Sequence, residues 1–256
     1  MRFTQQVPNQ SAIGSYYKSE NYISHTNTKK GFINRLYHIV RKRTLNQKRD
    51  LIERVTGLRK GNLLDVGSGT GAFARHMQDA GWKVSALEPD EDTRRRAFDL
   101  YGLSLSNMQQ LFSFPPGIFD AITLWHVLEH VHDLHEYLEQ VRNVLSDDGK
   151  AFIAVPNYTS YDASVYGQYW AAYDVPRHLY HFSPASMKQL LEKHGLKQIA
   201  IQPMWYDSFY VSLLSEQNKS GSANYSKALG TAIKSNWKTV WHNQKCSSLI
   251  YVIEKF

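Results

Sequence analysis

The chain has 256 residues, of which 42% are hydrophobic and 21% are charged, and this balance predicts a soluble globular protein with one main core. The single cysteine, the lack of an apolar run near the roughly 20 residues of a membrane helix, and the polar first segment argue against a disulfide scaffold, a membrane span and a secretory signal, so we expect a cytoplasmic protein. The net charge of +7 is uneven, because residues 1–60 hold 13 Lys/Arg against 3 Asp/Glu whereas residues 61–160 hold 7 against 14.

Residues 1–60 are predicted to form a basic N-terminal arm that ends in a helix. Residues 1–30 are polar and have no clear period, whereas residues 31–56 have helical spacing. The basic side chains of that helix are expected on its solvent face, namely Arg41, Lys42, Arg43, Lys48 and Arg49. A basic arm also suits an anionic partner, such as nucleic acid, a phosphorylated substrate or a membrane surface.

Strands and helices then alternate at short spacing. Helices are predicted for residues 72–80, 90–101 and 133–145, and strands for residues 62–66, 83–87, 103–106, 119–125 and 151–155. Further along, the pattern predicts a helix from Ser183, a strand at 197–203, a partly helical stretch at 214–245 and a closing strand at 248–253. This alternation indicates an α/β fold with a doubly wound, mostly parallel sheet and helices on both faces.

The most specific motif is the glycine turn Asp65-Val66-Gly67-Ser68-Gly69-Thr70-Gly71, which a strand enters and a helix leaves. Glycines let a ligand lie against bare backbone amides, and the following helix presents its free N–H groups there. Glu88 ends the next strand, where doubly wound folds place an acid that accepts the ribose hydroxyls of an adenosine. These features predict an adenosine-containing cofactor. The turn also fits the dinucleotide pattern, but Asp65 before the first glycine and the lack of a second catalytic domain argue against NAD.

Four segments resemble the class I S-adenosylmethionine-dependent methyltransferases: LLDVGSGTG (63–71), SALEPD (85–90), FDAITLWHVLEHV (119–131) and LSDDGKAFIAVPN (145–157). The resemblance is greatest to the ubiquinone-biosynthesis O-methyltransferases and to bacterial methyltransferases with a Pro-Arg-His-Leu segment. It implies a seven-stranded sheet of order 3-2-1-4-5-7-6, with the last strand antiparallel, in a methyltransferase domain of residues 61–256. It also implies S-adenosylmethionine as cofactor. The residues at its methionine end would be Asp65, Gly67, Ser68, Gly69 and Gly71, and Glu88 would bind the ribose. Asn107 and Met108 would lie near the adenine, and Leu124 and Trp125 would contact the cofactor from the end of the fourth strand.

The segment His126-Val127-Leu128-Glu129-His130 follows the fourth strand and is a candidate catalytic cluster. The resemblance implies that Glu129 and His130 help to bind a divalent metal, although His126 stands where metal-binding relatives have a further acid. One alternative is that His126 or His130 serves as a general base. Another is that Glu129 and His130 only cap and orient the next helix. A metal in addition to the cofactor is therefore left open.

Residues 158–182 and 204–245 are too long for simple connections and are expected to form an aromatic cap over the acceptor. Aromatic walls with a few polar groups are typical of small-molecule pockets. The candidate substrate contacts are Tyr169, Trp170, Arg177, His178 and His181, with Arg177 suited to a carboxylate or phosphate and the two histidines to a metal. The alternative is that these rings only pack the inserts onto the sheet.

The sequence therefore predicts an S-adenosylmethionine-dependent methyltransferase that acts on an oxygen of a small metabolite. Both an anionic and an uncharged metabolite are compatible with this prediction. His126, Glu129 and His130 are the predicted catalytic residues. Two alternatives stay open at this point: an RNA methyltransferase that uses the basic arm as a phosphate track, and a cofactor-binding module without catalysis. The expected partner is a small-molecule acceptor; nucleic acid is less favoured, and no membrane partner is expected.

Overall fold

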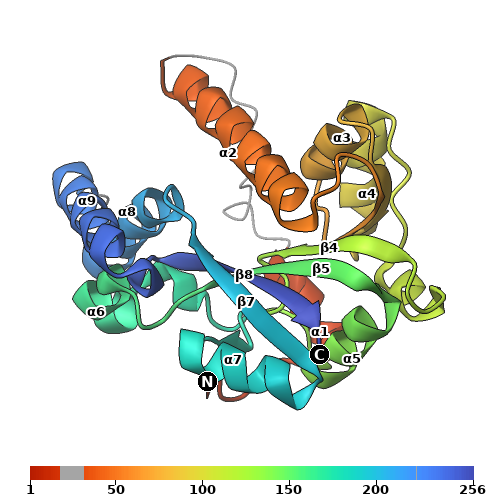
Figure 1. Cartoon of the computed structure of the whole chain (residues 1–256). Coiled ribbons are helices and arrows are strands. Elements are labelled where there is room, and N and C mark those ends of the chain that lie inside the picture. The colour runs from red at the N-terminus through yellow and green to blue at the C-terminus, as the bar shows by residue number, and fades with distance from the viewer. Residues whose placement is uncertain (18–31, 223) are drawn as a thin grey trace.

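The computed structural model describes residues 1–17, 32–222 and 224–256, and a mixed sheet of six strands lies at its centre (Figure 1). The sheet consists of β2 (Asn62–Val66), β3 (Lys83–Leu87), β4 (Phe119–Trp125), β5 (Leu145–Pro156), β7 (Leu196–Pro203) and β8 (Ser248–Lys255). Around it lie α2 (Phe32–Thr56), α3 (Ala72–Asp79), α4 (Glu91–Tyr101), α5 (Leu134–Val144) and α7 (Pro184–Lys193). The part of the predicted arm at residues 18–31 lies outside the described residues. In the described ranges, a helix with the length and apolarity of a bilayer span is absent.

The strand order is β3-β2-β4-β5-β8-β7. Parallel pairing joins β3 to β2, β2 to β4 and β4 to β5, whereas β8 runs antiparallel to both β5 and β7. The predicted order is thus confirmed for six strands, and so is the antiparallel closing strand. The predicted strand at 103–106 is wrong, so the sheet has six strands and not seven.

The segment 103–106 forms only an isolated bridge at the edge of the sheet. Ser106 is bridged in parallel to Leu87, and two backbone hydrogen bonds of 2.9 and 3.0 Å hold it there. Directly afterwards, Asn107 caps the 3-10 helix η3 (Met108–Ser113) by accepting a hydrogen bond from the Gln109 amide. The pairing stops after one bridge because the chain from Asn107 onward already follows a helical path.

Side chains of the central strands alternate between two apolar layers. In β5, Phe152 and Ala154 pack in the layer that holds α2 and α3, whereas Ile153 and Val155 pack in the layer that holds α5 and α7. Figure 1 shows these two helix pairs on opposite sides of the sheet. The two layers fix β2, β3 and β4 with their carboxyl ends at one edge, which is where ligands bind in open α/β sheets.

Two inserts pack on each other to form what we call the cap. The first, residues 158–182, contains α6 (Tyr161–Tyr166), the 3-10 turns η4 (Gly167–Tyr169) and η5 (Ala171–Tyr173), and β6 (Tyr180–His181). The second, residues 204–245, contains α8 (Asp207–Ser220), α9 (Tyr225–Trp241) and η6 (Asn243–Lys245). Tyr166 and Trp170 of the first insert and Val211 of the second belong to one buried apolar cluster. We keep as a proposal the division of the chain into an arm of residues 1–60 and a domain of residues 61–256.

The first 17 residues lie against the cap and the loop after β4. Strand β1 (Arg2–Phe3) pairs antiparallel with β6, and the Arg2 guanidinium lies 4.4 Å from the ring centroid of Tyr158. After α1 (Gln10–Ile13), the 3-10 turn η1 (Gly14–Tyr17) brings the hydroxyl of Tyr17 to within 2.9 Å of Nδ1 of His130. This start of the chain is therefore part of the folded body.

A buried carboxylate joins the cap to the sheet. Asp162 of α6 is fully buried and accepts hydrogen bonds from Trp170 Nε1 (2.7 Å), Ser247 Oγ (2.7 Å) and Ser235 Oγ (3.0 Å). The three donors come from the first insert, from the residue before β8 and from α9. Because each donor is itself buried, the carboxylate satisfies three polar groups that have left water.

We predict that Asp162→Ala lowers the free energy of unfolding by about 3 kcal/mol, since three buried donors lose their acceptor. Urea denaturation of the wild type and the variant measures this difference. The matched control is Asp148→Ala, at an exposed position of β5, which should change the free energy by less than about 0.5 kcal/mol. Equal effects of the two substitutions would contradict the role of Asp162.

Candidate functional site

The loop after β2 turns sharply over the carboxyl end of the sheet. Gly67, Gly69 and Gly71 have φ angles of 69°, 54° and 78°, a region that glycine adopts without strain. Helix α3 starts directly after Gly71, so the amide groups of its first turn lie next to the loop. The predicted combination of a tight glycine turn and a helix N-terminus is present, and it is an arrangement that suits anionic groups.

Asp65 braces this turn. Its buried carboxylate accepts a hydrogen bond from Thr123 Oγ1 on β4 (2.7 Å) and another from Ser68 Oγ. Burial raises the pKa of Asp65, while the two hydrogen bonds and the charge of Lys48 oppose the rise. The sequence suggests two roles for Asp65, binding an amino group and bracing the turn, and the structure shows the second.

The glycines of the turn differ in their surroundings. A Cβ atom on Gly67 would overlap Cγ2 of Val127, so the loop after β2 packs directly on the loop after β4. A Cβ atom on Gly71 would lie 2.9 Å from Cδ1 of Leu103. Around Gly69, in contrast, no described atom outside the turn comes within 4 Å of such a Cβ. The backbone at Gly69 therefore has room beside it for a ligand.

Glu88 follows β3, where the sequence predicts it, and its carboxylate reaches back to the glycine turn. Oε2 accepts a hydrogen bond from the Gly69 amide (2.9 Å), and Oε1 accepts one from the Asp90 amide (3.1 Å). Burial raises the pKa of Glu88. Because the carboxylate touches the one glycine of the turn that has open space, Glu88 and Gly69 form a single small site.

The two residues that the resemblance places near the adenine lie at the start of η3, with Asn107 as its N-cap and Met108 as its first residue. Asn107 is exposed and caps η3, whereas Met108 is largely buried in the main apolar core. Because η3 packs beside β3, both residues lie on the same side of the sheet edge as Glu88. Of the two, Asn107 has the side chain that a ligand can reach.

Strand β4 ends in a buried leucine and a tryptophan. Leu124 is fully buried, and Trp125 packs edge-on against Phe73. Nε1 of Trp125 is buried and has no hydrogen-bond partner among the described residues. The ammonium of Lys48 lies over the same ring, 4.1 Å from its centroid. An unpaired buried donor beside a cation is an arrangement that an anionic ligand would complete.

Lys48 reaches this position from α2, so its predicted place on the solvent face of that helix is wrong. Leu51 and Ile52, three and four residues later, are buried against the sheet, and Lys48 shares their side of the helix. Burial lowers the pKa of Lys48 to about 8, although Asp207 and Asp65 favour its charged form. The basic composition of the helix concealed one lysine that faces inward.

His126, directly after β4, connects the loop to the cap. Its backbone has a φ angle of 58°, which residues other than glycine rarely adopt. Its ring lies between two carboxylates, with Nδ1 3.3 Å from Oε1 of Glu129 and Nε2 3.2 Å from Oδ2 of Asp207. Burial lowers the pKa of His126, but the two carboxylates outweigh burial and raise it to about 10. At neutral pH, His126 is thus a cation that holds α8 of the cap against the loop after β4.

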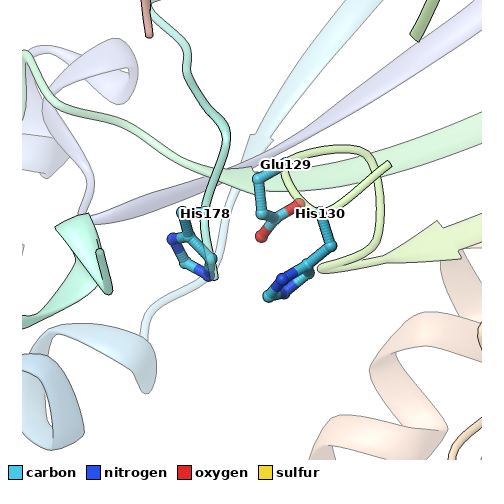
Figure 2. Close-up of side chains that lie close together, drawn as sticks. All are labelled: Glu129, His130 and His178. Carbon is cyan, nitrogen blue, oxygen red and sulfur yellow. The ribbon is translucent and has the colours of Figure 1, made fainter. Parts of the chain in front are cut away.

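Glu129, His130 and His178 gather at one point (Figure 2). One donor atom of each lies within 4.8 Å of those of the other two. The first two residues come from the loop after β4, and His178 comes from the first insert of the cap, where the Leu179 amide donates to the Glu129 carbonyl (2.7 Å). Oε2 of Glu129 is buried without a hydrogen-bond partner in the described part of the chain. Carboxylates and imidazoles are common ligands of divalent metals.

Backbone carbonyls orient the two imidazoles of this cluster. Nδ1 of His178 lies 2.9 Å from the Ala172 carbonyl, and Nδ1 of His130 lies 3.1 Å from the Arg177 carbonyl. Donation from Nδ1 leaves Nε2 of each ring with its lone pair. Burial and the neighbouring His130 lower the pKa of His178 to about 4, so its ring is neutral at neutral pH. A neutral ring is the form in which histidine binds a metal.

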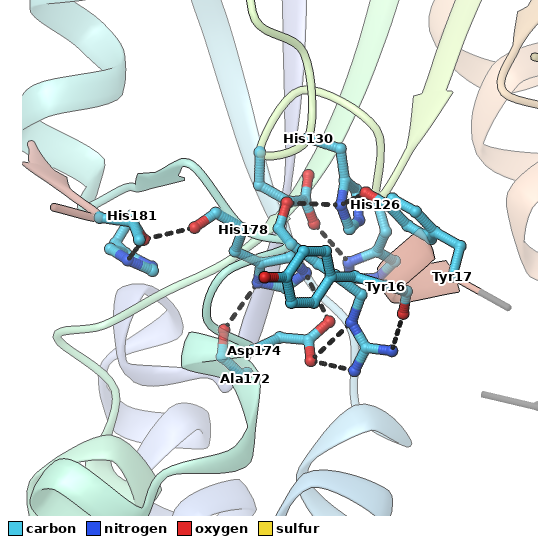
Figure 3. A network of polar contacts seen from close by, with 11 residues as sticks. Tyr16, Tyr17, His126, His130, Ala172, Asp174, His178 and His181 are labelled. Atoms are coloured by element: carbon cyan, nitrogen blue, oxygen red, sulfur yellow. Dashed lines mark hydrogen bonds and ion pairs between the residues drawn. The ribbon is translucent and has the colours of Figure 1, made fainter. Parts of the chain in front are cut away.

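A polar network surrounds the cluster (Figure 3). The hydroxyl of Tyr17 lies 2.9 Å from Nδ1 of His130. Arg177, predicted to bind an anionic substrate, pairs with Asp174 of the same insert and donates to the Tyr16 carbonyl (3.4 Å). An anionic acceptor would therefore have to share Arg177 with Asp174.

The other predicted substrate contacts lie in different surroundings. Trp170 is buried in the cap, where its Nε1 donates to Asp162, and Tyr169 is 40% exposed. His181 is buried next to Thr4, whose Oγ1 lies 3.2 Å from Nε2 of the ring. These positions favour the packing alternative for Trp170 and His181. His178 is the predicted contact that the structure brings to Glu129 and His130.

Three residues of the site were not predicted, namely Lys48, Asp207 and Tyr17. The signal for Lys48 is its spacing of three and four residues from the buried Leu51 and Ile52. Asp207 and Tyr17 carry no comparable local signal, because their partners His126 and His130 are 81 and 113 residues away in the chain. Only the folded structure brings these groups together.

Two kinds of comparison relate the chain to known sequences. A family model described as a methyltransferase domain matches residues 39–201. The ubiquinone biosynthesis O-methyltransferase of Xanthomonas euvesicatoria is 26% identical over 159 residues, which are 57% of this chain and 66% of that protein. The mitochondrial ubiquinone biosynthesis O-methyltransferase of Homo sapiens is 27% identical over 163 residues, 57% of this chain and 44% of that protein. The chain thus spans about two thirds of the first relative and less than half of the second.

A comparison with solved structures concerns the fold. The crystal structure of a SAM dependent methyltransferase from Archaeoglobus fulgidus matches with a TM-score of 0.56 and 18% sequence identity. The match covers 84% of this chain and 94% of that one. At this identity the likeness shows a shared fold.

Gly69→Ala tests whether the open side of the glycine turn receives the cofactor. Gly102, the C-cap of α4, has a similar φ angle of 66° and equally free surroundings, so Gly102→Ala carries the same backbone strain of about 1 kcal/mol. We expect the affinity for S-adenosylmethionine, measured by calorimetry, to fall at least about tenfold in Gly69→Ala and to stay unchanged in Gly102→Ala. Wild-type affinity in Gly69→Ala would show that the cofactor does not lie against this turn.

Proposed function

The chain belongs to the methyltransferase domain family, as the sequence predicts, and we propose that it transfers the methyl group of S-adenosylmethionine to an oxygen of a small metabolite. The observation that carries this proposal is the packing of Val127 on Gly67, which sets the cofactor turn beside the cluster of Glu129, His130 and His178. The names of the two relatives support oxygen as the acceptor atom. The proposed location is the cytoplasm, in keeping with a free, buried Cys246.

The residues at the sheet edge fit the proposed cofactor. When bound, S-adenosylmethionine supplies a methyl group that its sulfonium makes electrophilic. We assign the ribose hydroxyls to Glu88 and the backbone at Gly69, because the buried carboxylate and the open space lie together there. Asn107 is the proposed adenine contact. Leu124 and Trp125 line the methionine end, where Nε1 of Trp125 still lacks a partner among the described residues.

We assign the carboxylate of the cofactor's methionine end to Lys48. The ammonium lies over Trp125 at the end of β4, on the side of the sheet edge where Asp65 braces the turn. Burial makes this charge costly in the free protein, as the lowered pKa of Lys48 shows. An anionic group beside it would remove that cost, so binding energy is available at this point.

The cluster of Glu129, His130 and His178 fits a divalent metal. Its three donors are close enough to share one ion, and Oε2 of Glu129 is buried and unpaired in the described part of the chain. Nδ1 of each ring lies against a backbone carbonyl, which leaves Nε2 as the second nitrogen, and Nε2 of His178 also lies 3.7 Å from Oδ2 of Asp174. A metal held there would lower the pKa of an acceptor hydroxyl and fix its position. We propose these three residues as the ligands.

His130 is the proposed base, or the ligand nearest the reacting oxygen. His126 is unsuited to accept a proton, because Glu129 and Asp207 keep its pKa at about 10. We therefore assign His126 a positioning role. With no metal bound, Nε2 of His130 would take the proton of the acceptor; with a metal bound, that nitrogen would be a ligand and the ion would lower the pKa of the acceptor hydroxyl. The cap, held to the loop by Asp207, excludes water from the methyl transfer, which requires the acceptor oxygen in line with the departing sulfur.

We predict that the wild-type protein binds Mn²⁺ and that Glu129→Gln and His178→Ala each weaken this binding at least about tenfold, because the first removes the negative charge of a ligand and the second removes a ligand. Calorimetric titration with MnCl₂ measures the affinity. The control is His242→Ala, at an exposed histidine outside the cluster, which should bind as the wild type does. Wild-type protein without measurable Mn²⁺ binding would reject the metal and leave His130 as a base acting alone.

We predict that Lys48→Met weakens S-adenosylmethionine binding at least about tenfold while raising the free energy of unfolding at pH 7. The pKa of Lys48 is about 8 in the folded protein, against 10.5 for an ordinary lysine side chain in water. The wild type therefore loses stability as the pH falls from about 10.5 to about 8, and the variant does not.

Calorimetry and urea denaturation at pH 7 and pH 9.5 check both parts of this prediction. The advantage of Lys48→Met in stability should shrink at the higher pH. Lys42→Met, at an exposed position of the same helix, should change neither quantity. Unchanged cofactor affinity in Lys48→Met would refute the assigned contact, whatever happens to stability.

A further inference from the structure

Helix α9 lies at the outer edge of the cap (Figure 1). It exposes a stripe of large apolar side chains. Its exposed members are Tyr225, Leu229, Ile233, Trp237, Val240 and Trp241, whose exposed fractions range from 52% to 73%. Five of them recur at every fourth residue, so they follow one side of the helix. A continuous row of exposed large apolar side chains marks an interaction surface.

A row of lysines runs along one border of the stripe. Lys227, Lys234 and Lys238 project within about 40° of one another around the helix axis, between the stripe and the buried face. All three are exposed, and the helix contains no Asp or Glu. Nζ of Lys238 lies 4.7 Å from the ring centroid of Tyr161. The border of the stripe is therefore positively charged.

We propose that α9 docks the protein on the surface of an anionic phospholipid membrane. The helix would lie parallel to the surface, with Leu229 and Ile233 among the upper acyl groups and the lysines at the phosphates. Tyr225 and Trp241 stand at the two ends of the stripe, and tyrosine and tryptophan favour the interface between water and lipid. The combination of apolar stripe and lysine border is complementary to that interface in both polarity and charge.

Charge favours lipid over a second copy of the chain. An antiparallel two-fold pair of α9 stripes would bring the two lysine rows to the same border, with no acid on either α9 to balance them. Side-chain chemistry also favours lipid over RNA. Aromatic rings can stack on bases, but the aliphatic members of the stripe, Leu229, Ile233 and Val240, have no such use.

The docking surface requires no membrane span, so it revises the sequence-based expectation that a membrane is not a partner. That expectation rested on the lack of a long apolar run, and a surface helix needs apolar residues on one side only. The inference goes beyond the proposed methyl transfer and does not depend on it, because vesicle binding requires neither cofactor nor acceptor.

Co-sedimentation of the full chain with vesicles tests the proposal. We expect binding to vesicles of phosphatidylcholine that contain about one quarter phosphatidylglycerol, and at least about tenfold weaker binding to phosphatidylcholine alone. Added salt should weaken binding to the anionic vesicles, because it screens the lysines. Binding that ignores lipid charge, or no binding to either vesicle, would overturn the proposal.

Two double variants separate the parts of the surface. Trp237→Ser with Trp241→Ser should weaken binding to anionic vesicles at least about tenfold, and Lys227→Glu with Lys234→Glu should do the same. The matched controls are Phe98→Ser with Leu100→Ser on α4, where both side chains are also exposed, and Arg59→Glu with Lys60→Glu. Both controls should bind as the wild type does. Circular dichroism melts confirm that each variant is folded.

Two further results would replace the lipid by another occupant. If the wild type sediments as a dimer without vesicles and the tryptophan variant as a monomer that never binds lipid, the stripe joins two copies. If single-stranded RNA binds the wild type more tightly than anionic vesicles do, and the lysine variant loses that binding, the surface serves nucleic acid. Either result overturns the proposed docking on a membrane.

Discussion

The contact on which the site depends is the charged ring of His126 between the carboxylates of Glu129 and Asp207. Each carboxylate lies in a site that would raise its pKa by burial, and the ring lowers both pKa values. Without this cation, two acids would meet in a poorly hydrated place, which costs several kcal/mol. The backbone of His126 accepts a left-handed conformation to reach this position. Strain of this kind persists where the surroundings over-determine a residue, as they do here.

The sheet could be predicted largely from local patterns. Short apolar runs between turns identified β2, β3, β4 and β5. The helix predicted at 90–101 corresponds to α4, where the structure shows Asp90 as the N-cap and Gly102 in the left-handed conformation of a helix end. The prediction of a strand at 103–106 failed because the two leucines of this segment also fit a loop, and because a strand forms only where a partner strand pairs with it along several residues. Within this segment, Ser106 alone bridges Leu87, and the pairing ends where Asn107 becomes the N-cap residue of η3.

The site could be predicted where its residues are close in sequence. The glycine turn, Glu88 and the pair of Glu129 and His130 each carry a motif, and the structure places them at one edge of the sheet. The rest depends on distant contacts that no local pattern encodes. Trp170 shows why composition alone could not identify substrate contacts. An aromatic ring in a long insert can pack in the core of the cap as readily as against a substrate, and the indole N–H of Trp170 donates to Asp162.

The second insert of the cap inverts the usual packing of a helix pair. The buried side chains of α8 and α9 are mostly small, among them Ser208, Ser212, Ser215, Ala228, Ala232 and Ser235. These small residues let the two helices approach closely, while the large apolar side chains of α9 stay outside. The hydrophobic effect therefore contributes little inside the pair and would act on its outer face once a surface covers it. Because Asp207 at the start of α8 is held by His126, the inner end of the pair is fixed to the site. The helix pair α8 and α9 cannot turn the stripe inward without breaking the contact between His126 and Asp207. The stripe is therefore buried only when another surface covers α9 from outside.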